Sequence, residues 1–292
     1  MASKDISSVD FAVAPIILNG SMVINNGFNN TYRYVFPKNG ISLKDAKIAL
    51  GSINIYYSWA NITAANNNNS YQIIFPVGAS TQTFTLTMPD GFYQVTDLNS
   101  YLQSFCISNG LYLINSSGQY VYYLEWVENS SYYSIQLNAY SVPTSLPSGW
   151  SAPSNWVGYP TTDYTPQVVI LNNNFTSIVG FNAGTYPSTQ QTTTYSKLSS
   201  FTPEITPIQS LVLTCSLLNN EVSYPTTALY LFGPGNTSYG SLIQSSPNEY
   251  FFVNCFDGSY QYMDISILDQ NFNPVTIKDT NIIITLLLMI KK

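Results

Sequence analysis

The chain ends in the stretch Asn281-Ile-Ile-Ile-Thr-Leu-Leu-Leu-Met-Ile290, which is followed by Lys291 and Lys292. Ten residues in a strand span about 33 Å, because a strand rises about 3.3 Å per residue. This stretch is apolar on both faces, and an exposed edge strand of that kind invites aggregation. We therefore expect it to lie inside a sheet, covered on both faces, beside strands that come from far upstream.

A second strand is expected just before it, over residues 261–268. Met263, Ile265 and Ile267 recur there with the period of two that marks a half-buried strand. The following residues, 269–274, are rich in Asp, Asn and Pro, which favour turns. We expect residues 269–280 to cross between the two sheets of a sandwich rather than form a tight hairpin. The final strand should then pair with the first strands of the chain, around residues 21–36.

Composition favours an all-β protein. Charged residues make up 8% of the 292 residues and aromatic residues 15%, including 24 tyrosines. Aromatic and β-branched side chains suit a pleated sheet, whereas Asn, Ser, Gly and Pro suit turns. Few charges and many tyrosines also favour extensive protein–protein contact, because Tyr is enriched at interfaces. The alternative is that this composition reflects only the lineage of the protein.

The charge balance argues against a nucleic-acid-binding protein, which needs a basic stripe to neutralise phosphates. The chain has 15 acidic and 9 basic residues, a net charge of −6, and one arginine, Arg33. No apolar run reaches the roughly 18 residues of a transmembrane helix, and residues 1–10 lack the pattern of a secretory signal. We expect no direct nucleic-acid binding, no membrane span and no secretion through a signal peptide.

The three cysteines, Cys106, Cys215 and Cys255, lie far apart within apolar runs. Their spacing contains no CxxC pair, so a zinc site is not expected. We predict that they are reduced thiols in the core.

One helix is expected in the middle of the chain. Apolar residues at helical spacing from Val95 to Phe105 predict it, with Thr96 or Asp97 as N-cap and Asn109-Gly110 as the stop. Strands are expected at residues 21–24, 31–36, 46–59 (with a bulge at Gly51-Ser52), 71–75, 81–88, 111–114, 120–126, 132–137, 168–171, 177–181, 210–218, 228–232 and 249–255.

The strand count predicts a jelly roll. About three strands precede Pro89 and five follow Pro207, and eight is the jelly-roll count. We expect one eight-stranded jelly-roll β-sandwich with a large, loop-rich β insertion that contains one short helix. The expected divisions are an N-terminal arm at residues 1–20, a discontinuous jelly-roll domain at 21–89 and 207–292, and an insertion domain at 90–206.

No arrangement of residues predicts catalysis. The chain has no histidine, which removes the usual general base and the commonest metal ligand. A glycosidase would need a pair of carboxylates, and the candidate pairs are Glu125 with Glu128 and Asp264 with Asp269. Both pairs are better explained as solvated strand ends and turn residues. A calcium site formed by Asp257, Asp269 and Asp279 would lack a dense ligand loop. We predict no catalytic residue, no cofactor, no metal and no enzymatic activity.

Proline recurs often in the segment from Ser141 to about Thr206, which we call the proline-rich segment. Four of its aromatic residues remain as binding candidates: Trp150, Trp156, Tyr159 and Tyr164. Such side chains stack on sugars or contact proteins. The alternative is that they fill a small core of the insertion itself.

Three pairs of short stretches carry a further signal. They are Asp90-Gly-Phe-Tyr93 with Asp97-Leu-Asn-Ser-Tyr-Leu-Gln103, Thr206-Pro-Ile-Gln-Ser-Leu211 with Cys215-Ser-Leu-Leu-Asn-Asn220, and Asp257-Gly-Ser-Tyr260 with Leu268-Asp-Gln-Asn-Phe-Asn-Pro274. These turn and core motifs resemble those of the penton, or minor capsid, proteins of virophages and Maverick/Polinton-type viruses, the Mavirus type in particular. The likeness extends over most of the chain from about Ser21 on.

This resemblance implies a structural protein of the virion: a jelly roll that forms a homo-pentamer at the icosahedral vertices, surrounded by the double-jelly-roll major capsid protein of the same virus. It also implies assembly inside the infected host cell and an insertion that projects outward, where it would meet a host surface. It transfers no active-site residue. The alternative is a carbohydrate-binding or attachment β-sandwich, and a glycoside hydrolase ranks third.

Overall fold

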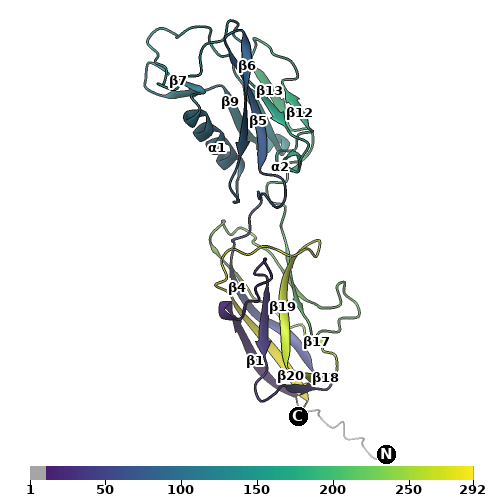
Figure 1. The fold of residues 1–292 in the computed structure, drawn as a ribbon. Helices are drawn as coiled ribbons and strands as arrows, with labels where there is room; N and C mark the ends of the chain where they lie inside the picture. Colours follow the sequence, from purple (N-terminus) through teal and green to yellow (C-terminus); the bar gives the residue numbers. More distant parts are fainter. Residues whose placement is uncertain (1–10, 292) are drawn as a thin grey trace, which may run out of the picture. The chain divides into compact units, whose positions relative to one another are not determined.

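The computed structural model describes residues 11–291. The chain divides into two compact units (Figure 1). Met1–Trp59 and Ile208–Lys292 form the first, which we call the jelly-roll unit, and Ala60–Pro207 forms the second, the inserted unit. Neither helix of the described residues is long and apolar enough to cross a membrane.

The first sheet of the jelly-roll unit has the antiparallel strand order β1-β20-β4-β16. Its strands are β1 (Phe11–Asn19), β20 (Ile283–Lys291), β4 (Lys47–Tyr56) and β16 (Leu242–Ser245), and the short β17 (Val253–Asn254) also pairs with β4. The β4–β20 register shifts so that Thr285 faces Ser52 while Leu286 faces Leu50. Gly51 is therefore the extra residue, which confirms the predicted bulge.

The second sheet has the antiparallel order β15-β14-β19-β2. Its strands are β15 (Ala228–Phe232), β14 (Leu211–Cys215), β19 (Tyr262–Asp269) and β2 (Thr31–Val35). A two-stranded piece joins β3 (Ile41–Leu43) to β18 (Gly258–Tyr260), and residues Gly20–Met22, expected to begin a strand, form a 3₁₀ turn instead.

The strand orders follow the jelly-roll pattern. Numbered 1 to 8 along the chain, the main strands run 1-8-3-6 in one sheet and 2-7-4-5 in the other. Strands that follow each other in sequence thus mostly lie in opposite sheets, as in two interlocked Greek keys. The apolar side chains of the two sheets face each other as a buried core: Ile16, Leu18, Ile48, Leu50, Ile53, Ile55, Ile284, Leu286 and Leu288 from the first, and Tyr32, Leu211, Leu213, Cys215, Met263, Ile265 and Ile267 from the second.

The connection from β19 to β20 crosses between the sheets, as predicted. The predicted partner of β20 is wrong, because β20 pairs with β1 and β4 and not with residues 21–36. Residues 11–19, expected as part of an arm, form β1, while residues 1–10 of that arm lie outside the described residues. Pro15 interrupts the strand pattern in the sequence, but an edge strand tolerates proline because one side of it forms no ladder.

The observed units also move the expected boundaries. The hairpin of β5 (Ser70–Val77) and β6 (Ser80–Thr87) belongs to the inserted unit, which begins at Ala60 rather than at residue 90. The reason is its partner, since β5 pairs with β11 (Gln167–Ile170) from the middle of the chain. The three upstream jelly-roll strands are instead β1, β2 and β4.

The inserted unit contains three sheets and two helices. Its sheets have the orders β12-β11-β5-β6, β13-β10-β9 and β7-β8. The remaining bounds are β7 (Tyr112–Ile114), β8 (Tyr120–Tyr122), β9 (Leu124–Asn129), β10 (Ser134–Ala139), β12 (Gly184–Tyr186), β13 (Tyr195–Leu198), α1 (Val95–Ser108) and α2 (Phe175–Val179), with a 3₁₀ turn at Ser130–Tyr132. Residues 177–181 were expected as a strand; instead α2 ends there at Gly180, whose φ of 72° suits a C-cap.

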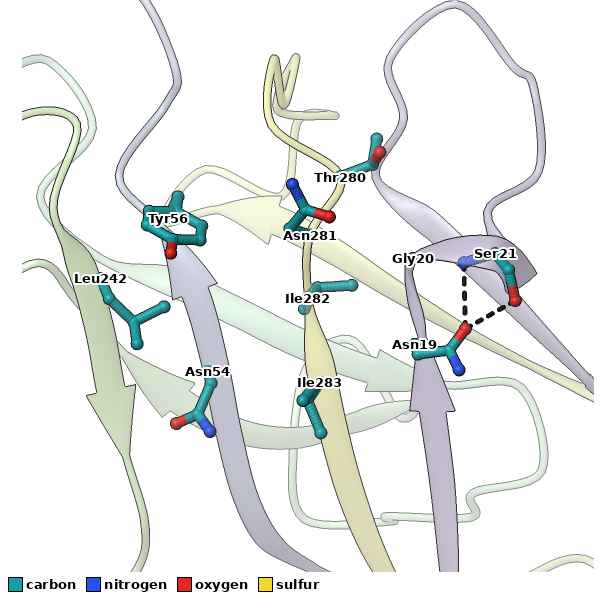
Figure 2. A pocket seen from close by; sticks show the side chains of 10 residues that line it. All are labelled: Asn19, Gly20, Ser21, Asn54, Tyr56, Leu242, Thr280, Asn281, Ile282 and Ile283. Atoms are coloured by element: carbon teal, nitrogen blue, oxygen red, sulfur yellow. Dashed lines mark hydrogen bonds between the residues drawn. The ribbon is translucent and has the colours of Figure 1, made fainter.

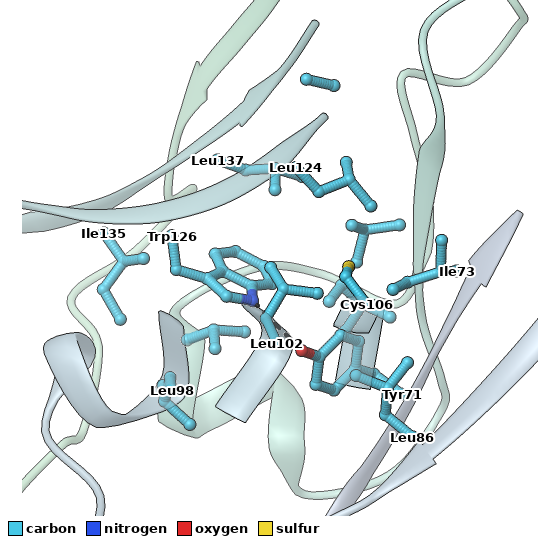
Figure 3. Close-up of a cluster of buried hydrophobic side chains, with 14 of the residues drawn as sticks. Tyr71, Ile73, Leu86, Leu98, Leu102, Cys106, Leu124, Trp126, Ile135 and Leu137 are labelled. Carbon is cyan, nitrogen blue, oxygen red and sulfur yellow. Dashed lines mark hydrogen bonds between the residues drawn. The ribbon is translucent and has the colours of Figure 1, made fainter. Parts of the chain in front are cut away.

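Helix α1 organises the core of the inserted unit. The backbone N–H of Gln94 donates to Asp97 Oδ2 at 2.9 Å, so Gln94 is the N-cap and Asp97 the third helical residue. Figure 3 shows Leu98, Leu102 and Cys106 in one buried cluster with Trp126 and Tyr71. The helix is thus where the sequence predicts it, but the predicted N-cap, Thr96 or Asp97, is wrong, because Gln94 caps the helix two or three residues earlier.

Candidate assembly surface

Strand β20 is apolar on both faces, but the described residues, 11–291, cover only one of them. Ile284, Leu286 and Leu288 point into the sandwich and are buried. On the opposite face Ile283 is 50% exposed, and Leu287 and Met289 are half-buried. The expectation that both faces are covered is therefore wrong for residues 11–291 of a single copy.

Strand β1 extends this uncovered face. Phe11, Val13 and Ile17 are 41%, 51% and 56% exposed. They lie on the same side of the sheet as the outer residues of β20, because Val13 pairs with Met289 and Ile17 with Thr285. We call this surface the outer apolar face; its members are Phe11, Val13, Pro15, Ile17, Ile283, Leu287 and Met289.

The outer apolar face ends at an open sheet edge. β1 is the last strand of its sheet, so the backbone groups on its far side have no partner strand among residues 11–291. Proteins usually protect such an edge with charges, bulges or a covering loop. β1 has nine residues and no charged side chain, and only Pro15 blunts it. An apolar open edge of this length suits contact with another protein.

A shallow groove of about 520 Å³ continues this surface where β1 ends (Figure 2). Outward side chains from all four strands line it, with the turn after β1 and residues 280–282. Asn19 fixes that turn, because its Oδ1 accepts from the backbone N–H of Ser21 at 3.0 Å and from Ser21 Oγ at 2.6 Å. Asn54 and Tyr56 add polar groups. The groove is therefore a mixed polar and apolar extension of the face.

The opposite edge of the sandwich is also apolar, with different residues. Leu231 on β15 is 60% exposed and Leu242 on β16 is 37% exposed. Among residues 11–291, 16 of the 23 exposed large apolar side chains belong to the jelly-roll unit: Phe11, Val13, Ile17, Phe28, Val35, Val222, Tyr224, Leu231, Tyr239, Leu242, Tyr250, Phe251, Phe256, Tyr262, Phe272 and Ile283. The jelly-roll unit therefore carries most of the uncovered apolar side chains.

Charged pairs contribute little to the surface of the jelly-roll unit. Arg33 binds Asp264 through two hydrogen bonds of 2.7 Å, and its guanidinium lies 3.9 Å from the centre of the Tyr262 ring. The hydrogen bond to Asp264 raises the pKa of Arg33. Lys291 and Asp45 form a looser pair at 4.0 Å. Pairs this exposed are weak, so apolar contact and hydrogen bonding dominate what the surface can do.

The structure does not bring the carboxylate pairs together as acid and base. Glu125 and Glu128 are three residues apart on β9, so their side chains leave opposite faces of the strand. Asp264 is held by Arg33, whereas Asp269 opens a turn and accepts from the backbone N–H groups of Asn271 and Asn273 at 2.8 Å each.

The three aspartates considered for calcium also have separate structural roles. Asp257 Oδ1 accepts from the backbone N–H of Asp45 at 2.9 Å, and Asp279 Oδ1 accepts from that of Asn281 at 2.9 Å. Within residues 11–291, no three Asp, Glu, Cys or His side chains form a group suited to a metal ion. These carboxylates stabilise turns.

The cysteines are free and buried, as predicted. Cys215 and Cys255 lie in the jelly-roll unit and Cys106 in the inserted unit. Burial raises the pKa of each thiol to about 12. The reactive thiolate is therefore scarce in the folded chain at neutral pH.

The four aromatic candidates of the proline-rich segment are all half-buried. Trp150, Trp156 and Tyr159 are half-buried against the core of the inserted unit, and Trp156 meets Phe75 edge-on at 6.1 Å. This favours the alternative that they fill that core. Trp150 also lines a groove.

Strand order and surface together define an all-β jelly-roll protein with an inserted second β unit. No family model matches the chain, and no curated protein matches it. Among solved structures, the chain is similar to the crystal structure of the mavirus penton protein, with 12% identity over 97% of this chain and 99% of that one and a TM-score of 0.41. It is also similar to the structure of the Sputnik virophage determined by cryo-EM, with 14% identity over 97% and 98% and a TM-score of 0.38. At such TM-scores the jelly-roll assignment rests on the strand order of this chain.

Sequence reasoning missed β1 as part of the surface. Its signal was present, since residues 11–18 are apolar at both odd and even positions, as in the final strand. Two adjacent strands that are apolar on both faces predict an uncovered sheet face when only one sheet packs against them.

Proposed function

We propose that this protein is a structural subunit of a viral capsid, without enzymatic activity, that assembles through its jelly-roll unit into a homo-pentamer at the icosahedral vertex. The observation that carries the proposal is strand β20: both of its faces are apolar, and residues 11–291 of one copy cover only one of them. A second protein surface is the natural cover for the other, because exposed apolar patches mark contact sites.

The two edges of the sandwich favour a ring over a twofold dimer. β1 and β2 end the two sheets on one side, where Val13, Ile17 and Val35 are exposed. The β15–β16 side presents Leu231 and Leu242. A contact between two different surfaces repeats head to tail and forms a ring where the rotation between subunits closes, whereas a twofold dimer uses the same surface twice. The number five comes from the penton resemblance of the sequence.

The same resemblance supports the remaining parts of the proposal: a major capsid protein of the same virus as neighbour, the virion as the site of the protein, assembly in the infected cell, and an outward-facing insertion. Low charge fits burial between neighbours, since interface cores are depleted in charged residues. The chain has 9 basic residues in all, which supports contact with protein rather than with the genome.

The test is the mass of the purified protein by sedimentation over a range of concentrations, with matched variants. Ile17→Lys places a charge in the outer apolar face at a side chain that is 56% exposed. The matched control, Thr83→Lys, places the same charge on an exposed position of β6 in the inserted unit. We expect the wild type and Thr83→Lys to form pentamers and Ile17→Lys to remain a folded monomer. Equal assembly of the two variants would contradict the proposal.

A further inference from the structure

The inserted unit has an aromatic groove of about 470 Å³, within the range of about 300–1,000 Å³ that small-ligand sites occupy. Its walls come from residues 121–123, which run from β8 to the start of β9, and from the segment after β10. The lining residues are Val121, Tyr122, Tyr123, Tyr140, Ser141, Pro143, Pro147 and Trp150. Tyr140 is 38% exposed, and Tyr122 and Trp150 are half-buried. The groove therefore offers aromatic surface to a ligand.

Backbone hydrogen bonds hold both walls in place. The N–H of Tyr140 donates to the carbonyl of Tyr123 at 2.9 Å, which extends the β9–β10 ladder into the groove. Ser151 and Ile114 exchange two hydrogen bonds of 2.9 Å, which fixes the residue next to Trp150. A preformed site does not spend binding energy on ordering its own loops.

A fixed carboxylate lies one hydrogen bond beyond the groove. The hydroxyl of Tyr140 donates to Glu125 Oε2 at 3.0 Å, and Asn138 Nδ2 donates to the same oxygen at 3.3 Å. Gln136 Nε2 holds Asn138 Oδ1 at 2.9 Å and Ser196 Oγ at 2.9 Å. Burial, followed by the hydrogen bond and charge of Glu125, raises the pKa of Tyr140, so its hydroxyl remains protonated. Glu125 Oε1 accepts no hydrogen bond from the described residues, and Glu125 is partly exposed.

The charge of the inserted unit restricts the ligand. Residues 60–207 contain a single basic side chain, Lys197, whose Nζ lies 4.9 Å from the centre of the Tyr186 ring. No basic side chain lines the groove, and the charge that is hydrogen-bonded to its lining is the Glu125 carboxylate. A sulfated, sialylated or phosphorylated ligand would therefore meet repulsion without a cation to bind it.

We propose that this groove binds a neutral glycan. The apolar face of a sugar ring would stack on Trp150 or Tyr122, and its hydroxyls would donate to Glu125. Aromatic faces supply contact area, and a charged acceptor makes the stronger hydrogen bond to a hydroxyl. This goes beyond the proposed assembly role and does not depend on it, because every residue involved belongs to the inserted unit.

The test is saturation-transfer NMR and tryptophan fluorescence on the full chain with neutral sugars: glucose, galactose, mannose, N-acetylglucosamine and lactose. Sialyllactose serves as the anionic counterpart of lactose, tetramethylammonium as a cationic probe and oligoproline as a peptide probe. We expect saturable millimolar binding of at least one neutral sugar and none of sialyllactose. Failure of all neutral sugars, or binding of tetramethylammonium or oligoproline in their place, would overturn the proposal. Loss of assembly alone would leave it intact.

Variants locate the site. Trp150→Ala and Glu125→Gln are each expected to weaken sugar binding about tenfold, through the lost ring face and the lost charged acceptor. Tyr140→Phe, which keeps the ring, provides a second test if Trp150→Ala does not fold, and continued protection of Cys106 from a thiol reagent reports folding of the unit. Tyr132→Ala, at a tyrosine 70% exposed and outside the groove lining, is the matched control and should bind as the wild type does. Equal affinity of all variants would place any binding elsewhere.

Discussion

Two adjacent leucines of β20 should give opposite phenotypes when each is replaced by alanine. Leu286 points into the sandwich, is fully buried, and pairs with Ile16 of β1 and Leu50 of β4. Leu287 points to the outer apolar face and is half-buried. Successive residues of a strand face opposite sides, so the same chemical change reports the core in one variant and the assembly surface in the other.

The two costs follow from burial. Removing a fully buried leucine costs about 2–5 kcal/mol, because a cavity remains as well as the lost transfer free energy. That is a large share of the roughly 5–15 kcal/mol that stabilises a typical domain. Burying a whole leucine is worth about 1.5–3 kcal/mol, so the half-buried Leu287 should cost only about 1 kcal/mol. Its larger effect should be weaker assembly, since the exposed half of its surface is what a neighbour would cover.

The cysteines make an assay that reads each unit separately. Cys215 and Cys255 become reactive when the jelly-roll unit opens, and Cys106 when the inserted unit opens. Labelling with a thiol reagent across a urea series, followed by mass spectrometry, gives one midpoint per unit. Leu286→Ala should lower the midpoint of Cys215 and Cys255 strongly and leave that of Cys106 unchanged. Leu287→Ala should shift both midpoints little while reducing the mass seen in sedimentation.

The reasoning would be refuted if Leu287→Ala destabilised the jelly-roll unit as much as Leu286→Ala. That result would mean that the outer apolar face is part of a covered core. Normal assembly by Leu287→Ala with an unchanged concentration dependence would remove this residue from the interface.

Three further predictions follow from single sites. Gly110→Ala should destabilise the inserted unit more than Gly118→Ala. Both glycines have positive φ (64° and 78°), but only at Gly110 would an added Cβ collide with a backbone oxygen, that of Asn155. Equal urea midpoints for Cys106 in the two variants would contradict this. Asn61→Ala should also destabilise the inserted unit, because the buried Asn61 amide donates to the carbonyls of Tyr93 and Ile205 at 2.8 Å each and accepts from the Tyr93 N–H at 2.8 Å. Each buried group left unpaired costs about 1–3 kcal/mol. Exposed Asn66→Ala is the control, and the same Cys106 urea midpoint in both variants would refute the argument. Alkali should weaken the jelly-roll unit, because burial raises the pKa of its two thiols from 9.0 to about 12. The stability that this difference contributes is present below about pH 9 and is lost as the pH rises towards 12. Circular dichroism should show a urea midpoint that falls over that window, and a constant midpoint would contradict the assignment.

The closing strand shows how far the sequence leads. Its length, its apolar character and the turn-rich segment before it predict an internal strand and a crossover, and both are present. The sequence could not show that one face stays uncovered, because apolar residues look the same against the core and against a neighbouring molecule. That distinction needs the position of every other strand.

Pairing across long distances explains the other differences. The β5–β6 hairpin is clear in the sequence, but hairpins are local and do not reveal that β5 pairs with β11 some hundred residues later. The segment ending at Gly180 is too short to separate helix from strand by period. The groove of the inserted unit is formed by residues 121–123, at the end of β8, and by the loop after β10. Of its lining only Trp150 stood out in the sequence.

The measurement that tests the central proposal most directly is imaging of the purified protein, with rotational symmetry determined from class averages of single particles. We expect rings with fivefold symmetry in which the outer apolar face is covered by the neighbouring subunit. A protein that stays monomeric at high concentration, or a twofold dimer, would contradict the proposed vertex role.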